Sequence, residues 1–226
     1  MPRYIEELVS QQVHRSELAR QREIETGRPC GSSVVTLSRR MGSGARIVAA
    51  KLAHELGWSL WDRELIDEIA QNAEVSRPVV EAFDEKTISE IELFAHGMFG
   101  DHEMADFLYA RHLARAVASI ARLGNAIILG RGANYLLPDA LNIRIDASDE
   151  RRIENMMNYE NLTREQAIAK LHDSDRERRH FLYTLFGRER VESTIYDLTI
   201  WMDKFTSDDA VDIIKAAVKA RCGWRG

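Results

Sequence analysis

The chain has 226 residues, of which 45% are hydrophobic and 30% are charged, and its formal net charge at pH 7 is −5. Such a composition is typical of a soluble globular protein with one α/β core and room for a small subdomain. The negative net charge argues against general binding to nucleic acid or to a membrane surface.

The sequence also indicates a compartment. It has no apolar run long enough to span a membrane and no signal-peptide pattern. Its two cysteines, Cys30 and Cys222, lack metal-ligand spacing, and we expect free thiols in a reducing environment. We therefore expect a cytoplasmic protein that binds neither nucleic acid nor a membrane.

Residues 1–32 are predicted to form a helical extension to the main domain. A sparse apolar stripe runs through this polar segment, at Ile5, Leu8, Val9, Val13 and Leu18. We expect a solvent-exposed or partner-packed helix that ends near Gly27, and a homodimer contact is one role for it. The extension carries no recognisable chemistry.

The next segment predicts a phosphate site. An apolar run, Val34 to Leu37, leads to Gly42-Ser43-Gly44 and then to helical apolar spacing from Ala45 to Leu56. A strand, a glycine loop and a helix place backbone N–H groups and a helix N-terminus around one anion, and this arrangement favours phosphate.

This loop departs from the usual G-x-x-x-x-G-K-[ST] pattern, since Ala45 stands in the lysine position and Ile47 in the hydroxyl position. Positive charge comes instead from Arg39, Arg40 and Arg46, and arginine can bind phosphate through two parallel hydrogen bonds. A glycine-containing turn with incidental arginines is the competing interpretation.

Further strands and helices alternate along the chain. Strands are predicted over 58–61, 125–130, 141–147 and 197–201. Helices are predicted over 65–70 and 107–123, and from Ser76, Ser148, Thr163 (a capping box with Gln166, running toward Arg179) and Thr206 or Ser207. The segment 84–106 is predicted to be mobile or shaped around a substrate.

Five short strands alternating with helices predict an α/β fold with a parallel, doubly wound sheet. Ligands of such sheets bind at the carboxyl ends of the strands. Four polar clusters fall at these ends: Arg39 to Arg46, Asp62-Arg63, Arg131, and Asp146 to Arg152. Helix capping explains Ser148 and Asp149, but it explains Arg131 poorly, because a cation at a helix N-terminus opposes the helix dipole. Arg131 is therefore a strong candidate for binding an anionic ligand.

A second charged segment runs from Asp173 to His180 and precedes Phe181, Tyr183 and Phe186. A solvated helix face would explain the charges alone. An arginine-rich helical hairpin that closes over phosphates would explain the charges and the aromatic residues together. The histidines show no HExxH spacing and G-x-S-x-G is absent, so we expect no metal site of protein ligands and no serine-hydrolase chemistry.

The chain resembles the cytidylate-kinase-like family, a branch of the nucleoside-monophosphate kinases, over residues 33–221. The resemblance rests on SRRMGSGAR, WDRELI, ILGRGANYLLPDALNIRIDASDERR, DSDRERR and YDLTIWMD, in matching order and spacing. It implies a P-loop kinase-like domain over 33–226, with a five-stranded parallel sheet flanked by helices. It also implies a helical acceptor-binding insertion over 62–110 and an arginine-bearing lid over 155–190.

The resemblance also implies site residues. The loop residues Gly42, Ser43, Gly44 and Ala45 would cradle the donor phosphates. Asp62 and Arg63 match a D-[KR]-E motif and would lie beside the transferred phosphate or Mg²⁺. Arg131 matches the arginine of a G-R-D motif that contacts the acceptor nucleotide, and Asp175, Arg176 and Arg178 match a D-R-x-R lid pattern.

Two departures from the family pattern bear on function. Gly132 replaces the aspartate of the G-R-D motif, which weakens the case for cytosine as the acceptor base. The missing lysine is common to the branch whose loop reads S-R-x-x-G-S-G-[GA]-R. Our hypothesis is that Arg39 or Arg46, with Arg176 and Arg178, neutralises the β- and γ-phosphates.

The leading hypothesis is therefore a kinase that transfers the γ-phosphoryl group of Mg²⁺·ATP to a small acceptor, such as the nucleoside monophosphate CMP. The alternative is a non-catalytic nucleotide-binding or regulatory protein, favoured by Ala45, Ile47 and Gly132. The clustered charges at Arg131, Asp175, Arg176 and Arg178 argue against that alternative, and against a purely structural α/β protein.

Overall fold

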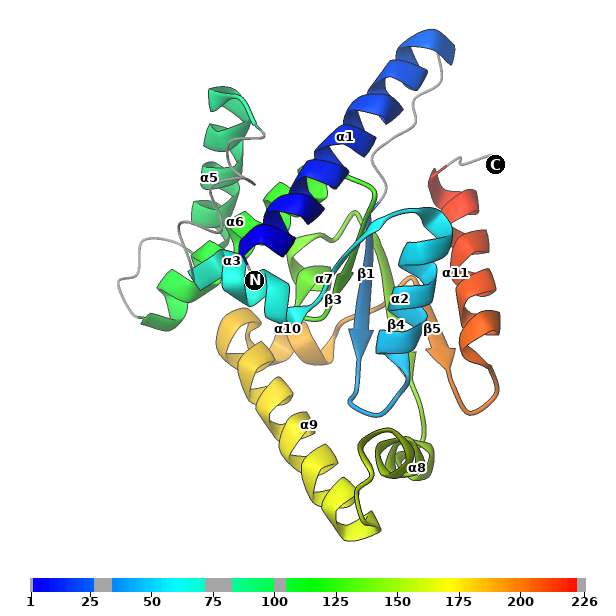
Figure 1. Ribbon diagram of the computed structural model, residues 1–226. Helices are drawn as coiled ribbons and strands as arrows, with labels where there is room; N and C mark the ends of the chain where they lie inside the picture. The colour runs from blue at the N-terminus through cyan, green and yellow to red at the C-terminus, as the bar shows by residue number, and fades with distance from the viewer. Residues whose placement is uncertain (1, 27–33, 72–82, 100–104, 223–226) are drawn as a thin grey trace.

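A five-stranded parallel sheet forms the centre of the protein (Figure 1). The computed structural model describes residues 2–26, 34–71, 83–99 and 105–222. The strands are β1 (Val34–Arg39), β2 (Ser59–Trp61), β3 (Ala126–Leu129), β4 (Leu141–Asp146) and β5 (Leu198–Trp201). They lie in the order β2-β3-β1-β4-β5, which confirms the predicted parallel α/β fold.

Strand β3 shows why both faces of the sheet are covered. Ile127 and Leu129 belong to an apolar cluster shared with α2 (Ala45–Leu56) and α11 (Ser207–Cys222). Ala126 and Ile128 belong to the opposite cluster, shared with α3 (Arg63–Gln71) and α6 (Ala105–Leu123). Because side chains alternate along a strand, a continuously apolar strand has to be buried on both faces.

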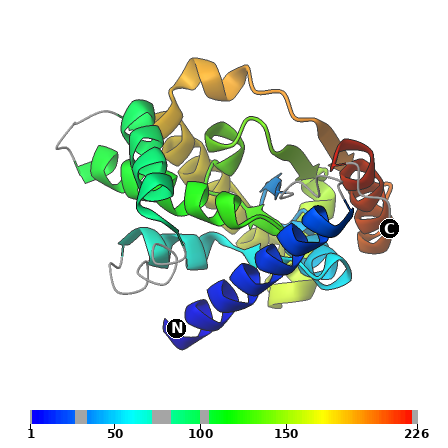
Figure 2. The same cartoon turned by 90° about the horizontal axis from the view of Figure 1, so that it is seen from above.

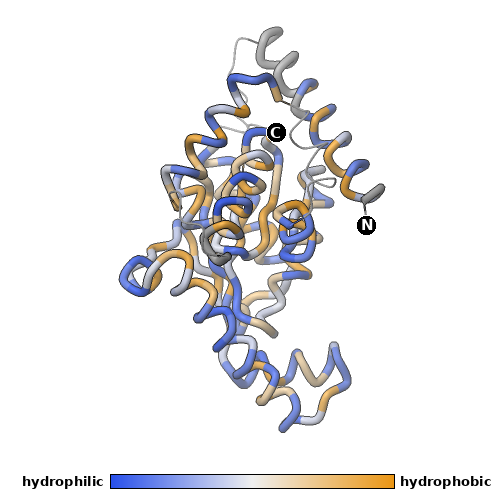
Figure 3. Tube along the Cα trace, turned by 90° about the vertical axis from the view of Figure 1, so that its left-hand side faces the viewer, coloured by the Kyte–Doolittle hydropathy of each residue, from blue (hydrophilic) through white to orange (hydrophobic). Residues whose placement is uncertain are grey.

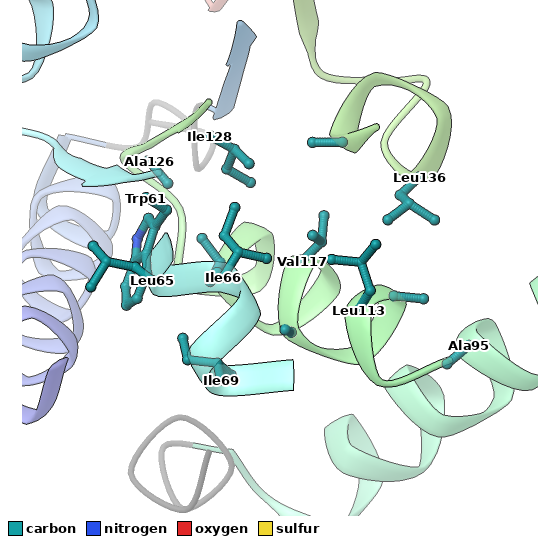
Figure 4. Close-up of a cluster of buried hydrophobic side chains, with 14 of the residues drawn as sticks. Trp61, Leu65, Ile66, Ile69, Ala95, Leu113, Val117, Ala126, Ile128 and Leu136 are labelled. Atoms are coloured by element: carbon teal, nitrogen blue, oxygen red, sulfur yellow. The ribbon is translucent and has the colours of Figure 1, made fainter. Parts of the chain in front are cut away.

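The cluster under α3 and α6 is the larger of the two (Figure 4). The fully buried ring of Trp61 lies beside Leu65 and Ile66, and Leu113 and Val117 of α6 belong to the same cluster. Helix α5 (Glu85–Phe99) packs along α6 through Ile91, Ala95 and Phe99. Residues 85–99 of the segment predicted to be mobile or shaped around a substrate therefore form a regular helix, since their apolar residues recur at a helical spacing. The helix predicted from Ser76 lies outside the described residues.

Helix α1 (Pro2–Thr26) crosses the same side of the sheet (Figure 2). Ile5 and Val9 are buried in the cluster of α3 and α6, and Leu8 and Val13 pack against it, so this part of the apolar stripe contacts the chain itself, whereas Leu18 is exposed. Gln12 is fully buried beside them. Its Nε2 donates to the carbonyls of Ile120 and Gly124, and its Oε1 accepts from Trp61 Nε1 at 2.8 Å.

Four helices follow the carboxyl ends of β3 and β4. They are α7 (Ala133–Leu136), α8 (Asp149–Glu160), α9 (Arg164–Phe186) and α10 (Arg188–Glu192). Ser148 caps α8, and the predicted capping box of Thr163 and Gln166 starts α9. Helix α9 continues past Arg179 to Phe186, because the aromatic residues after the charged segment pack against the cluster of α3 and α6.

Helices α8 and α9 project beyond the arrowheads of the strands, at the bottom of Figure 1, and Figure 3 shows the same projection edge-on. Ile153 and Met156 of α8 pack there against Ala167 and Leu171 of α9. The predicted lid segment, 155–190, thus comprises the end of α8, all of α9 and the start of α10. None of the described helices is long and apolar enough to cross a bilayer.

Candidate active site

The glycine loop connects β1 to α2 and packs tightly under α8. Gly42 and Gly44 adopt φ of +80° and +82°, in the left-handed region that favours glycine. A Cβ on Gly42 would come within 2.8 Å of the carbonyl oxygen of Arg152. Only glycine fits at that position, so the close approach of loop and helix explains the first glycine of the motif.

The loop leaves polar groups available to a ligand. Ile47 N–H is the first amide of α2 to bond inside the helix, to Gly44 O, so the amides of Gly44, Ala45 and Arg46 precede the helical bonds. The hydroxyl of Ser43 is buried and has no hydrogen-bond partner among the described residues. Buried polar groups without a partner are uncommon in proteins and call for a ligand or water. The loop therefore has the donors that an anion site needs.

Side chains of α8 and α9 hold the loop from behind. Arg152, only 2% exposed, donates from Nε to the carbonyl of Met41 at 2.7 Å. Asn155 donates from Nδ2 to the carbonyl of Gly42 at 2.7 Å. Arg178 donates from Nη1 to the carbonyl of Arg39 at 2.6 Å.

Asp175 connects two of these side chains. Its carboxylate accepts from Arg152 Nη2, with both oxygens at 2.9 Å, and from Arg178 Nη2 at 2.5 Å. The structure thus places Arg178 at the end of β1, and Asp175 beside Arg178 and Arg152. It does not bring Arg176 there, because Arg176 is exposed and pairs with Asp173 on the outer side of α9.

Two of the three loop arginines already have carboxylate partners. Arg40 bonds to Asp146 at 2.7 Å and to Asp149 at 3.1 Å. Arg46 is 64% exposed and donates to Asp62 at 3.0 Å and to Glu64 at 3.2 Å, and the hydrogen bond to Asp62 raises the pKa of Arg46. Arg46 and Asp62 were both predicted to lie beside the transferred phosphate, and here they lie beside each other.

Arg39 is in a different situation. Its Nε is buried and has no hydrogen-bond partner within the part of the chain that the structure describes. Burial lowers the pKa of Arg39, and the charges of Arg178 and Arg46 lower it further. A buried cation next to other cations is costly unless an anion joins them. Arg39 therefore marks the position where negative charge is missing.

A cavity of about 180 Å³ opens next to Arg39, at the ends of β1 and β3 and under α9. Its lining includes Phe181, Tyr196 and five arginines: Arg39, Arg63, Arg131, Arg144 and Arg178. One carboxylate, that of Glu177, lines it among the described residues. Such a charge balance suits a ligand with several negative charges.

Arg131 is fixed at the wall of this cavity. It has a φ of +54°, pairs with Asp67 of α3, and lies with its guanidinium 4.7 Å from the centre of the Phe181 ring. Asp67 also accepts from the hydroxyl of Tyr109 at 2.7 Å. Burial and the hydrogen bond to Asp67 raise the pKa of Tyr109, so this hydroxyl keeps its proton and its donor role. Arg131 is thus held in one orientation from two sides.

A larger cavity, of about 460 Å³, is lined on one wall by the ion pair of Arg152 and Asp175. Its apolar lining residues are Ile153, Ile168 and Leu171, and its polar lining includes Arg40, Arg176 and Arg179. Arg39 lines the smaller cavity and Arg40 lines the larger one, so the segment that leads from β1 into the glycine loop borders two cavities of different character. The smaller one is dominated by arginine, and the larger one combines arginine with apolar surface.

Several residues of the site were missed from the sequence. Arg152 and Asn155 hold the loop and Asp67 holds Arg131, but none of them was predicted to do so. For Arg152 a signal existed, since a cation in the first turn of α8 opposes the helix dipole, as it does at Arg131. For Asp67 the only signal was an acidic residue near WDRELI.

Within the described residues, no group of three or more His, Cys, Asp or Glu side chains could hold a metal ion. Asp62 and Glu64 lie together near Arg46. Mg²⁺ in kinases is bound by one or two carboxylates and by substrate phosphates rather than by a complete set of protein ligands. The carboxylates of Asp62 and Glu64 fit that requirement, with nucleotide phosphates supplying further ligands.

A parallel sheet in this strand order, a glycine loop after β1 and arginine-bearing helices above it define a kinase-like α/β protein. The chain belongs to the cytidylate kinase-like family, which matches residues 34–204. Membership of this family indicates a kinase-type protein.

Individual relatives agree with this assignment. The chain is 27% identical over 192 residues to a cytidylate kinase of Pyrococcus furiosus, covering 84% of this chain and 90% of the relative. It is 26% identical over 196 residues to a cytidylate kinase of Thermococcus kodakarensis, with the same coverage. The crystal structure of an uncharacterized protein from Eubacterium ventriosum superposes with a TM-score of 0.54 at 19% identity, covering 83% of this chain and 99% of that one, which shows a shared fold.

Proposed function

We propose that this chain is a phosphotransferase that moves the γ-phosphoryl group of ATP to a nucleoside monophosphate such as CMP. The observation that carries the proposal is that Arg39 and Arg40, which lead into the glycine loop, each line a cavity, and that one of these cavities is lined by five arginines. The loop lies at the end of the central strand β1, between β3 and β4, where ligands of doubly wound sheets bind. The cytidylate kinases among its relatives support CMP as the first acceptor to test.

The arrangement suggests a role for each group. The donor phosphates would bind the amides of Gly44, Ala45 and Arg46, with the nucleoside toward the larger cavity. The acceptor phosphate would bind in the smaller cavity, where Arg39 lacks an anionic partner and Arg131 is held ready by Asp67. Arg178 borders both the loop and this cavity, so it would neutralise charge on the transferred group.

Phosphoryl transfer of this kind needs no covalent intermediate, because positioning and charge neutralisation supply most of the rate. The acceptor phosphate would attack in line with the bond to the leaving diphosphate. Mg²⁺, held by Asp62 together with the donor phosphates, would add positive charge where the lysine of the usual P-loop pattern is absent. Arg46 would then exchange its bond with Asp62 for a bond to the donor phosphates.

A second candidate function is nucleotide binding without turnover. The pairing of Arg40 and Arg46 with carboxylates favours it, because paired arginines offer less net charge to a triphosphate. The unpartnered Nε of Arg39 and the unpartnered Ser43 hydroxyl favour a bound ligand under either candidate function.

A transfer assay separates the two candidates. Purified protein would be incubated with Mg²⁺ and ATP labelled at the γ-phosphate, with each common nucleoside monophosphate and a set of phosphorylated metabolites as acceptors. We expect label on CMP or dCMP. Label on another acceptor would keep the kinase and replace the acceptor. ATP binding without any transfer would support the non-catalytic protein, and R131Q serves as the control variant that should lose transfer.

A further inference from the structure

Two α8 side chains bond to consecutive carbonyls of the glycine loop. Arg152 Nε donates to the carbonyl of Met41, and Asn155 Nδ2 donates to the carbonyl of Gly42, both at 2.7 Å. Both side chains are nearly excluded from solvent, at 2% and 9% exposure. Neither residue faces solvent as a spare phosphate ligand would, so their contacts with the loop backbone call for a separate explanation.

The geometry of the peptide bond supplies that explanation. A trans peptide is planar, and its C=O and N–H point in opposite directions. Holding the carbonyls of Met41 and Gly42 against α8 therefore fixes the two peptide planes that follow, and the Ser43 amide of the second plane donates back to the carbonyl of Arg40 at 3.3 Å. A carbonyl that turned toward a phosphate would repel it, while a fixed amide attracts it. A loop of two glycines is otherwise free to make that turn.

We infer that Arg152 and Asn155 are positioning residues of the glycine loop, which hold its carbonyls away from the donor triphosphate and keep the loop in the conformation that presents the amides of Gly44, Ala45 and Arg46. This inference rests on the function proposed above. It gives a physical reason why a loop with Ala45 in place of lysine keeps phosphate affinity, since preorganised donors need no reorganisation when the anion arrives. Arg152 acts here through the loop and not by touching the phosphate.

A simpler role for Arg152 would be to attach α9 to α8 through Asp175, to which it donates at 2.9 Å. Asn155 distinguishes the two roles, because its amide bonds to the loop at Gly42 O. Arg151 offers a matched control on the same turn of α8, since it is half-exposed and pairs with Glu154. A variant of Arg151 removes one positive charge from α8 without altering a contact to the loop.

The test uses full-length R152Q, N155A and R151Q. Hydrogen exchange of the peptide covering residues 38–46 reports on the loop directly, without any ligand. Equilibrium binding of a fluorescent ATP analogue and the KM for each substrate report on the consequence. We expect R152Q and N155A to raise exchange in this peptide and to weaken ATP binding about tenfold. The KM for the acceptor should stay unchanged, and R151Q should match the wild type throughout.

The outcomes are distinguishable. Unchanged exchange and unchanged ATP affinity in N155A would overturn the inference and leave Arg152 as a link between helices. An equal rise in both KM values would also overturn it, because that pattern indicates general loss of structure. If the wild type binds no triphosphate, the proposed function fails, and the exchange data alone decide whether the two residues hold the loop.

Discussion

Gly132 lies directly against the ring of Phe186. A Cβ built on Gly132 would come within 2.3 Å of one ring carbon and within 2.8 Å of a second. The ring cannot retreat easily, because it stacks on Tyr135 with centroids 4.7 Å apart and packs near Phe99. The aspartate of the G-R-D motif therefore has no room in this chain, and its absence is a consequence of how α9 ends against the core.

The first prediction concerns this contact. G132A should destabilise the protein by about 2–4 kcal/mol, combining overpacking with the strain of a non-glycine residue at φ of +66°. G130A is the matched control, since Gly130 also has a positive φ, of +88°, but a Cβ there meets nothing within 4 Å. Urea unfolding measures both.

The clash with the ring should account for the difference between the two variants. In the background F186L, where the ring is gone, G132A should cost no more than G130A, because the two positions share one contact and their effects are not additive. Equal costs of G132A and G130A in the wild-type background would show that Phe186 moves aside freely.

The sequence predicted the sheet well for a physical reason. The central strand β1 begins with an apolar run and β3 is apolar and buried throughout, and burial on both faces produces such runs whatever the neighbouring segments are. The position of the glycine loop could also be predicted, because the residues that define it are consecutive in the sequence. The predicted convergence of Arg39, Arg63 and Arg131 followed from topology, since the carboxyl ends of parallel strands meet at one edge.

The hydrogen-bond partners of these residues could not be predicted from the sequence, because they come from segments that are far away along the chain. Asp67 lies 64 positions from the Arg131 that it orients, and Asn155 lies 113 positions from Gly42. Gln12 looked like one polar residue among many on an isolated helix. Its burial depends on Trp61 and on the end of α6, neither of which the local pattern of residues 1–26 reveals.

The second prediction tests the docking of α1. Q12A removes the partner of Trp61 Nε1 and of two buried carbonyls, and each orphaned group costs about 1–3 kcal/mol. The melting temperature should fall by about 2–4 °C for each kcal/mol lost in a protein of this size. Q11A is the matched control, because Gln11 is exposed on the same helix and its loss should leave the melting temperature unchanged. A similar fall in both variants would show that the hydrogen bonds of Gln12 are not its cause, because alanine is the better helix former at both positions.

The third prediction concerns Arg46 as a phosphate ligand. Arg46 is mostly exposed and its pair with Asp62 is screened by solvent, so R46A should change the stability of the free protein by less than about 1 kcal/mol. Binding of ATP should weaken about tenfold, because a charge-assisted contact to phosphate is lost. Isothermal titration measures the dissociation constant.

R164A provides the comparison for Arg46, since Arg164 is also exposed and forms a bidentate pair with Glu150 on the far side of α8. It should leave ATP binding unchanged. If R46A also binds ATP as the wild type does, Arg46 is not a phosphate ligand and Arg39 becomes the better candidate for that role.

The fourth prediction concerns Asp146, which is buried at the end of β4 between two arginines. Burial alone would raise the pKa of its carboxyl, but hydrogen bonds from Arg40 at 2.7 Å and from Arg144 at 2.7 and 3.0 Å outweigh it and lower the pKa. A lowered pKa in the folded state means that ionised Asp146 stabilises the fold above the pKa of the unfolded chain, about 3.9. This contribution is lost as the pH falls from there through the lower pKa of the folded state.

D146N should therefore destabilise the protein most at neutral pH, by about 3–5 kcal/mol, the usual cost of breaking a buried ion pair. The difference in unfolding free energy between wild type and D146N should shrink once the pH falls below about 4, because the wild-type carboxyl then loses its charge as well. Urea unfolding at pH values of about 7, 5 and 3.5 measures this difference. A difference that stays constant over this range would mean that the pKa of Asp146 is the same in the folded and unfolded states. The charge of the two arginines would then not be what stabilises the carboxylate.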